Sequence, residues 1–155
     1  MAQLTSREVV DRFAHALSTK NLDEAISVLS EDLVEDYPQS GERIVGRDNW
    51  VALLTAWPMS DQITTTVNRV VGSEDQWVMG PVWRMTKIVG TGDQFWASGT
   101  IDYPDGSQWH LVQLIQLRDG KISRMTSYFA EPFPAADWRK PYVQLASEAP
   151  AGAKA

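Results

Sequence analysis

The segment QWHLVQLIQLRDGKISRMTSYFA, residues 108–130, has the pattern of a β-hairpin. Apolar and polar side chains alternate along residues 108–117 and again along residues 122–129, as they do on strands that bury one face. The two runs are separated by Arg118-Asp119-Gly120-Lys121, and an Asp-Gly pair between alternating runs is a strong signal for a tight turn. The segment therefore predicts two antiparallel strands joined at Asp119-Gly120.

The same two-residue period extends toward the N-terminus. It predicts strands over residues 77–88 and 95–103, which end at the turn sequences Gly90-Thr91-Gly92-Asp93 and Pro104-Asp105-Gly106-Ser107. With the hairpin, these strands form a four-strand antiparallel meander. Residues 63–71, which precede it, are also rich in Thr and Val and fit a strand.

The first third of the chain has a helical period. Thr5 with Glu8 is a capping box, and Asn21 with Glu24 repeats it, so two short helices are predicted there. A short strand is expected over residues 33–37, and a third helix begins near Asp48 and stops at Pro58. Three helices followed by a meander predict an α+β domain, with the helices packed on one face of a curved sheet.

Composition narrows the possible functions. A chain of 155 residues fits one domain, and its net charge of −6 excludes a dedicated nucleic-acid binder. It has no cysteine, which excludes disulfides, thiolate nucleophiles and cysteine-bound metals. No signal sequence or membrane-length apolar run is found, so we expect a cytoplasmic protein with no membrane partner. Seven Trp among its aromatic residues must be buried or must line a pocket.

Three segments carry a resemblance to a known family: Val34-Glu35-Asp36-Tyr37-Pro38, Val45-Gly46-Arg47-Asp48 and Tyr128-Phe129-Ala130-Glu131-Pro132. With the predicted order of elements, they resemble the nuclear transport factor 2-like superfamily over about residues 5–135, and most closely its SnoaL-like branch, which is similar to ketosteroid isomerase. This implies a cone-shaped half-barrel with three N-terminal helices on a curved, mostly antiparallel sheet. We expect the domain to span residues 1–140 and residues 141–155 to form a frayed tail.

The resemblance also implies a function. Many proteins of this fold are cofactor-independent enzymes that use a general acid or base on an apolar small molecule, by isomerisation, cyclisation, dehydration or hydrolysis. Two alternatives stay open, since fold alone does not determine function: a module that only binds a hydrophobic ligand, and a structural or assembly role. We expect no cofactor and no metal, because the chain has only two histidines and no cysteine. A homodimer is expected from the family and from Val112 and Leu114, which alternation leaves on the outer face.

Asp36 is the first catalytic candidate. It lies just before Pro38, where ketosteroid isomerase places its general base. A carboxylate at the rim of an aromatic pocket is partly desolvated, which raises its pKa toward the range useful for taking a proton. The alternative is a solvated carboxylate beside Glu35 and Glu42.

Three further residues are candidates for stabilising an oxyanion or moving a proton. Gln113 shares a strand face with four apolar residues and can donate through its amide. His110 falls on the opposite face by strict alternation, but imidazole suits acid or base work near neutral pH. His15 lies in the first helix near the position of the oxyanion-hole Tyr of the isomerase. Each has an ordinary structural alternative, an amide or imidazole satisfied by its neighbours or by solvent.

Six residues are candidates for the walls of a substrate pocket. Ser127, Met125 and Phe129 alternate onto one face of the last strand, and Phe129 matches an aromatic residue that stacks on substrate in the isomerase. The others are Trp50, Trp57 and Trp83, although most Trp at such spacing belong to the core.

The chain departs from the better-known catalytic patterns. Limonene epoxide hydrolase needs an Asp-Arg-Asp set, and this chain has Asp102 but Thr100 and Ser127 at the other two positions. This argues against epoxide hydrolysis by that mechanism. The oxyanion Tyr and Asp of the isomerase are also missing, which makes steroid isomerisation by the same groups doubtful.

Overall fold

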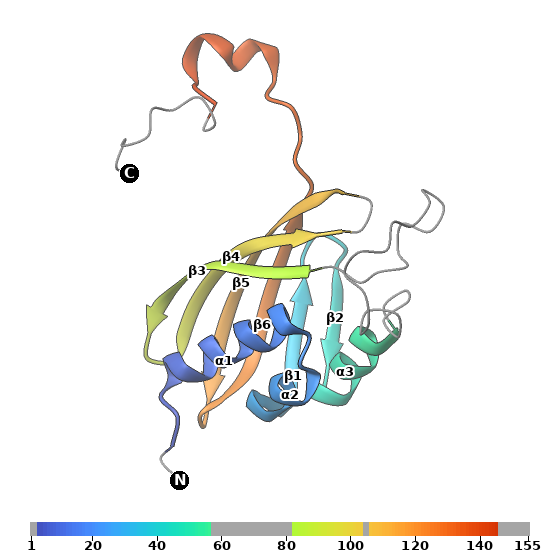
Figure 1. The fold of residues 1–155 in the computed structure, drawn as a ribbon, viewed down its shortest axis with the longest axis vertical. Helices are drawn as coiled ribbons and strands as arrows, with labels where there is room; N and C mark the ends of the chain where they lie inside the picture. The colour runs from blue at the N-terminus through green and yellow to red at the C-terminus, as the bar shows by residue number, and fades with distance from the viewer. Residues whose placement is uncertain (1–2, 57–81, 104–105, 146–155) are drawn as a thin grey trace.

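The computed structural model describes residues 3–56, 82–103 and 106–145 (Figure 1). Its six-stranded sheet has the order β2-β1-β6-β5-β4-β3, in which β1 pairs with β6 in parallel and every other pair is antiparallel. The elements in chain order are α1 (Ser6–Thr19), α2 (Leu22–Val28), β1 (Leu29–Tyr37), β2 (Glu42–Val45), α3 (Arg47–Ala56), β3 (Val82–Thr91), β4 (Gln94–Asp102), β5 (Gln108–Arg118), β6 (Lys121–Ala130) and the 3₁₀ helix η3 (Asp137–Tyr142).

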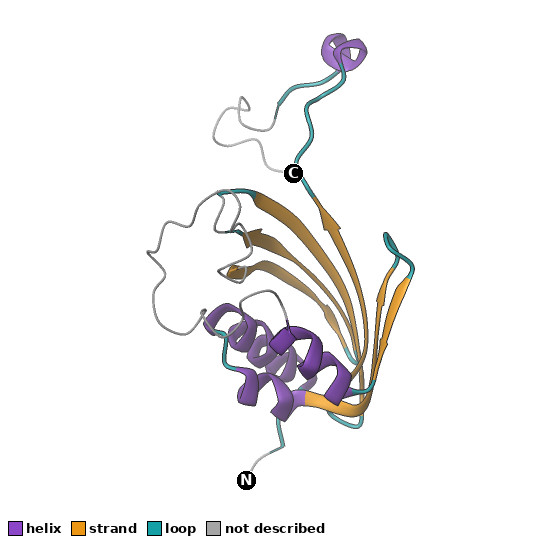
Figure 2. Cartoon of the chain, turned by 90° about the vertical axis from the view of Figure 1, so that its right-hand side faces the viewer, coloured by secondary structure: helices purple, strands orange, loops and turns teal. Residues whose placement is uncertain are grey.

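The arrangement confirms the predicted α+β class. The sheet is strongly curved and stays open, with β2 and β3 at its edges. Figure 2 shows the three α-helices packed against the concave side, at one end of the strands. Alternation along β4, which is buried at every second residue, separates this concave face from an outer face.

The turn between β5 and β6 follows the sequence signal. Asp119 and Gly120 both have positive φ, 54° and 72°, as a type I′ hairpin turn requires. The strands on either side pair from His110 with Ala130 to Arg118 with Lys121, interrupted by one register shift after Gln116. The predicted meander therefore has the expected pairing in β3 to β6.

Helix α1 begins with the predicted capping box. Thr5 accepts the backbone N–H of Glu8, and the Glu8 carboxylate accepts the backbone N–H of Thr5 at 2.7 Å. We expect Thr5→Ala to lower the free energy of unfolding by about 1 kcal/mol, measured by urea denaturation. Thr19→Ala, at the exposed end of the same helix, is the control and should change it by less than about 0.5 kcal/mol. Equal losses in both variants would show that the capping box contributes nothing.

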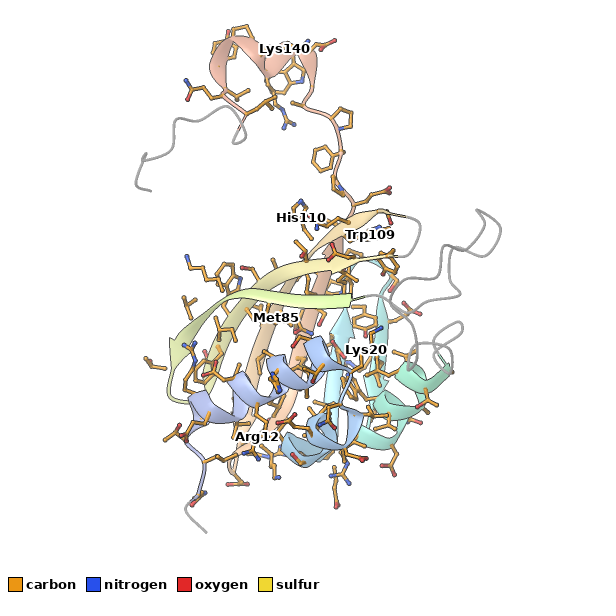
Figure 3. The ribbon with its side chains drawn as sticks, viewed as in Figure 1. Arg12, Lys20, Met85, Trp109, His110 and Lys140 are labelled. Carbon is orange, nitrogen blue, oxygen red and sulfur yellow. The ribbon has the colours of Figure 1, made fainter. Side chains whose placement is uncertain are left out.

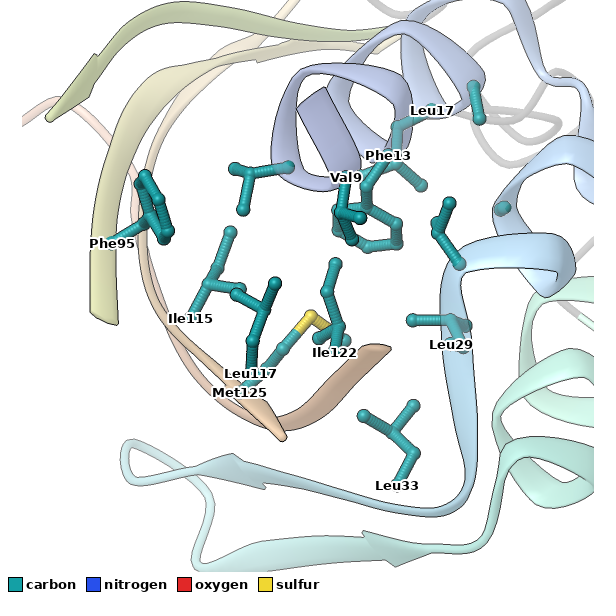
Figure 4. Close-up of a cluster of buried hydrophobic side chains, with 14 of the residues drawn as sticks. Val9, Phe13, Leu17, Leu29, Leu33, Phe95, Ile115, Leu117, Ile122 and Met125 are labelled. Carbon is teal, nitrogen blue, oxygen red and sulfur yellow. The ribbon is translucent and has the colours of Figure 1, made fainter. Parts of the chain in front are cut away.

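The hydrophobic core lies between the helices and the lower half of the concave face. Figure 4 shows Phe13 and Val9 of α1 facing Ile115 of β5 and Met125 of β6. These side chains are fully or almost fully buried, together with Trp50 of α3. Burial of this apolar area is the main force that holds the helices on the sheet.

The structure corrects the sequence prediction around β1. The strand begins at Leu29 rather than residue 33, and its pairing with β6 shifts between Leu29 and Val34. A second strand, β2, stands where only a turn and connection were expected. Helix α3 ends at Ala56, and the predicted strand over residues 63–71 lies outside the described residues.

The chain after β6 leaves the body of the fold as an arm, residues 131–145 (Figure 2). The large apolar side chains of Phe133, Trp138 and Tyr142 are exposed on it. The predicted domain boundary at residue 140 falls inside η3, and residues 146–155 of the predicted tail lie outside the described part. Among the described helices, none is long and apolar enough to cross a bilayer.

Candidate active site

The concave face holds a buried carboxylate, that of Glu35 on β1. Leu33 and Tyr37 stand two residues away on either side, so the pleat turns all three side chains toward the same face. Glu35 is only 2% exposed, although charged side chains are almost never fully buried unless they are paired. None of the ion pairs among the described residues includes Glu35. Its neighbours are instead neutral hydrogen-bonding groups.

Two elements bring donors to the Glu35 carboxylate. Trp50 Nε1 of α3 donates to Oε2 at 2.8 Å, and Ser127 Oγ of β6 donates to Oε1 at 2.5 Å. Gln113 Nε2 of β5 in turn donates to Ser127 Oγ at 3.0 Å. The side chains of Tyr37 and Gln113 add further hydrogen bonding to the carboxylate. We call these five residues, Glu35, Tyr37, Trp50, Gln113 and Ser127, the Glu35 cluster.

Burial dominates the titration of this carboxylate. Removal from water raises the pKa of Glu35 above its usual range, and the hydrogen bonds from Ser127 and Trp50 only partly offset this effect. Burial and the neighbouring Glu35 charge also raise the pKa of the Tyr37 phenol, which therefore stays protonated. A carboxylate whose pKa is shifted upward holds a proton more readily near neutral pH, as a general base or acid must.

Gln113 occupies the place that alternation predicted, on the concave face of β5. It is 3% exposed and pairs across the ladder with Ser127. Its Nε2 atom is bonded, but its Oε1 atom is buried and has no hydrogen-bond partner in the described part of the chain. A buried carbonyl without a donor is unfavourable, and in a native protein it calls for an explanation.

Aromatic side chains lie beyond the cluster on the same face. Phe129 of β6 contacts the ring of Tyr37 edge-on, with centroids 5.4 Å apart, and Tyr103 contacts Trp109 in the same way at 6.0 Å. All four are partly buried rather than part of the main core. Partly buried aromatic rings therefore lie on the same face of the sheet as the Glu35 cluster.

Asp36, the predicted base, lies on the opposite side of the sheet. Its carboxylate binds Arg43 of β2 at 2.5 Å and Arg124 of β6 at 2.8 Å. The Arg43 guanidinium, and after it Arg124, holds the pKa of Asp36 below its usual range. The prediction that desolvation raises the pKa of Asp36 is therefore wrong, because two cations compensate for its partial burial.

The two histidines do not join the Glu35 cluster. His15 is exposed on α1, and His110 is exposed on the outer face of β5, as alternation indicated. Figure 3 shows His110 and Trp109 at the end of the sheet from which the arm leaves, away from α1. No described group of His, Asp or Glu side chains is arranged to hold a metal ion.

The predicted pocket walls divide between the site and the core. Trp50 and Ser127 bind Glu35, and Phe129 lies beside Tyr37. Met125 is fully buried in the main core, so it belongs to the core and not to the Glu35 cluster. Trp57 lies outside the described residues, and the side chain of Trp83 on β3 does too.

Sequence reasoning missed Glu35, although a signal for it was present. Glu35 alternates with Leu33 and Tyr37, which places it on the face that a strand of this kind turns inward. A shift of one residue reverses the face of every side chain on a strand. The assignment to Asp36 was thus one residue away from the buried carboxylate.

Known proteins share this architecture. A family model described as the SnoaL-like domain matches residues 10–125. The crystal structure of an NTF2-like protein of unknown function from Burkholderia xenovorans LB400 is 29% identical, with 90% of this chain and 94% of that chain covered and a TM-score of 0.68.

Two other structures carry named activities. A protein from Kribbella flavida, assigned provisionally as a ketosteroid isomerase, is 19% identical over 90% of this chain and 88% of that chain, with a TM-score of 0.72. An LEH-like epoxide hydrolase from M. tuberculosis is 21% identical over 80% and 81% of the two chains, with a TM-score of 0.57. No curated protein matches the chain in sequence. At these identities the two structures show a common fold.

Proposed function

Because the chain belongs to the SnoaL-like domain family, we propose that it is a cofactor-independent enzyme whose general base is Glu35. The observation that carries the proposal is a carboxylate that is 2% exposed and bound by neutral donors. A carboxylate neutralised by an arginine is a weak base, whereas this one has a raised pKa. Similar folds named as isomerase and epoxide hydrolase support a reaction on a small molecule.

The substrate class follows from the surroundings of Glu35. Tyr37, Phe129 and Trp109 place partly buried rings on the concave side, and no described ion pair reaches the Glu35 carboxylate. We propose an apolar, flat molecule with a proton made acidic by an adjacent carbonyl. Isomerisation, cyclisation and dehydration each begin when a base takes such a proton from the substrate, whereas in hydrolysis the base takes a proton from the attacking water.

The experiment is proton exchange. The protein is incubated in deuterated buffer with a panel of enolisable bicyclic and tricyclic ketones, each of which also carries a ring O–H or N–H, and loss of the α-proton signals is followed by NMR. Exchange above the buffer rate identifies the base chemistry even where no net product forms. Tight binding of a panel member without exchange would instead favour the alternative, a module that binds a hydrophobic ligand.

We also propose that the protein is a homodimer through the outer face of the sheet. Val89 of β3, Leu114 of β5 and Tyr128 of β6 are 42%, 47% and 42% exposed. A groove of about 490 Å³, lined by Leu114, Trp96 and Arg124 among others, runs across the same strands. A second copy fits this face, because an isologous contact would cover the apolar band of both copies at once.

Leu114→Arg tests this interface. In sedimentation equilibrium, we expect the wild type to have twice the chain mass of 17.3 kDa and Leu114→Arg to have the chain mass, because a buried unpaired cation opposes association. Leu53→Arg, at an apolar position on α3 that is 36% exposed, is the control and should remain a dimer, because α3 lies on the concave side of the sheet. A wild type at 17.3 kDa at micromolar concentration would refute the dimer.

A further inference from the structure

The orientation of the Gln113 amide, and with it the position of the unpartnered Oε1 atom, follows from the donors and acceptors around it while Glu35 is ionised. Trp50 Nε1 is a donor only, so Glu35 Oε2 must accept from it. An ionised Glu35 also accepts at Oε1, so the single hydroxyl proton of Ser127 points to Glu35. The Ser127 oxygen must then accept, and Gln113 supplies the N–H.

This series of hydrogen bonds fixes the orientation of the Gln113 amide. While Glu35 is ionised, Nε2 is held by Ser127 and by the carboxylate, and Oε1 faces the position where the described residues supply no donor. The groups that face the carboxylate are Tyr37 of β1, Trp50 of α3, Gln113 of β5 and Ser127 of β6. An acceptor without a donor among the described residues, Gln113 Oε1, therefore lies beside the proposed base.

We propose that Gln113 Oε1 is the recognition point for a ligand that donates a hydrogen bond, an O–H or N–H on a flat apolar ring system, and that loss of the Glu35 charge turns this acceptor into a donor. This inference rests on the proposed function for one point only, namely that the ligand binds beside Glu35. The half-buried rings of Tyr37 and Phe129 provide the flat contact. A molecule with only a carbonyl is disfavoured at this position, since two acceptors would face each other.

The reversal follows from the same bonds. A neutral group at Glu35 still has to accept from Trp50, and the protonated phenol of Tyr37 is a donor to it as well. Its own proton is therefore directed toward Ser127 Oγ. Ser127 then accepts from residue 35, and its hydroxyl proton turns to Gln113. The Gln113 amide rotates to present Oε1 to that proton, and Nε2 takes the place that Oε1 held. Glu35→Gln imposes this state permanently, because the N–H of the new amide faces Ser127.

Three bicyclic probes of similar size test the proposal. Indole has one N–H donor and no strong acceptor, 1-indanone has one carbonyl acceptor and no donor, and indene has neither. By titration calorimetry in alkaline buffer, which favours the ionised form of Glu35, we expect the wild type to bind indole about tenfold more tightly than indene, and 1-indanone no more tightly than indene. Glu35→Gln is expected to reverse this order, with 1-indanone about tenfold tighter than indene.

Gln113→Met is the matched control, since it keeps the length of the side chain and removes both polar atoms. Circular dichroism and thermal unfolding establish that each variant is folded. In Gln113→Met, the three probes are expected to bind within about twofold of one another. Preserved discrimination in this variant would overturn the assignment to Gln113.

The remaining outcomes are also decisive. Equal binding of the three probes to the wild type, or no binding of any, would overturn the recognition site. An unchanged order of preference in Glu35→Gln would overturn the reversal. If the wild type discriminates as expected but Glu35→Gln retains full proton exchange with a ketone substrate, the recognition site stands and the proposed function fails.

Discussion

Glu35→Gln is expected to reduce the rate of proton exchange or turnover by roughly 10²- to 10⁴-fold, the usual contribution of a general base. The substitution keeps the size of the side chain and an acceptor for Trp50 Nε1, so the cluster retains its shape. What it removes is the basic carboxylate oxygen that takes the proton. The measurement is the initial rate of deuterium exchange into the best ketone of the panel, at a pH where the wild-type rate is maximal.

Asp36→Asn is the matched comparison, because it makes the same chemical change on the next residue of the same strand. Asp36 is held on the outer face by Arg43 and Arg124, so the rate is expected to stay within about twofold of the wild type. A large loss in Asp36→Asn with none in Glu35→Gln would restore Asp36 as the base. A full rate in both variants would remove the carboxylates of β1 from the mechanism.

The fold could be predicted where local signals were strong. The Asp119-Gly120 turn adopts the positive φ angles that its residues favour, and the strands on both sides pair as alternation indicated. The capping box at Thr5 marks the start of α1 correctly. The parallel pairing of β1 with β6 is different, because it joins segments about ninety residues apart and has no local sequence signature. The strand β2 pairs with β1 across a single short turn, but its four residues are too few to show a period of two in the sequence.

The site could be predicted only in part. Gln113 and Ser127 share the concave face as the period-two pattern requires, and they do meet across the ladder. Which carboxylate of β1 meets them depends on the register of that strand, and the irregular pairing after Leu29 changes that register. The indole of Trp50 reaches Glu35 from a different element, α3, so only the tertiary structure brings the two together.

The stability of the protein is expected to depend on pH in opposite directions through the two neighbouring carboxylates. Because burial raises the pKa of Glu35, the folded state binds a proton there more tightly than the unfolded state does. The folded state therefore loses stability as pH rises from the ordinary glutamate value to the raised one, and the loss is complete above it. Glu35→Gln removes this loss, so at neutral pH it should be more stable than the wild type.

Asp36 is expected to change the stability with pH in the opposite direction. Its arginine partners lower its pKa, so its stabilising contribution is present above the ordinary aspartate value and is lost as pH falls through that value and the lowered one. Urea denaturation of the wild type and both single variants between about pH 4 and pH 8 measures the two effects together. Relative to the wild type, Glu35→Gln should gain stability as pH rises and Asp36→Asn should lose it. If the stability difference from the wild type changed with pH in the same way in both variants, both carboxylates would be solvated alike. The proposal of Glu35 as a buried base would then be refuted, because an ordinary solvated carboxylate on β1 could not carry the proposed chemistry.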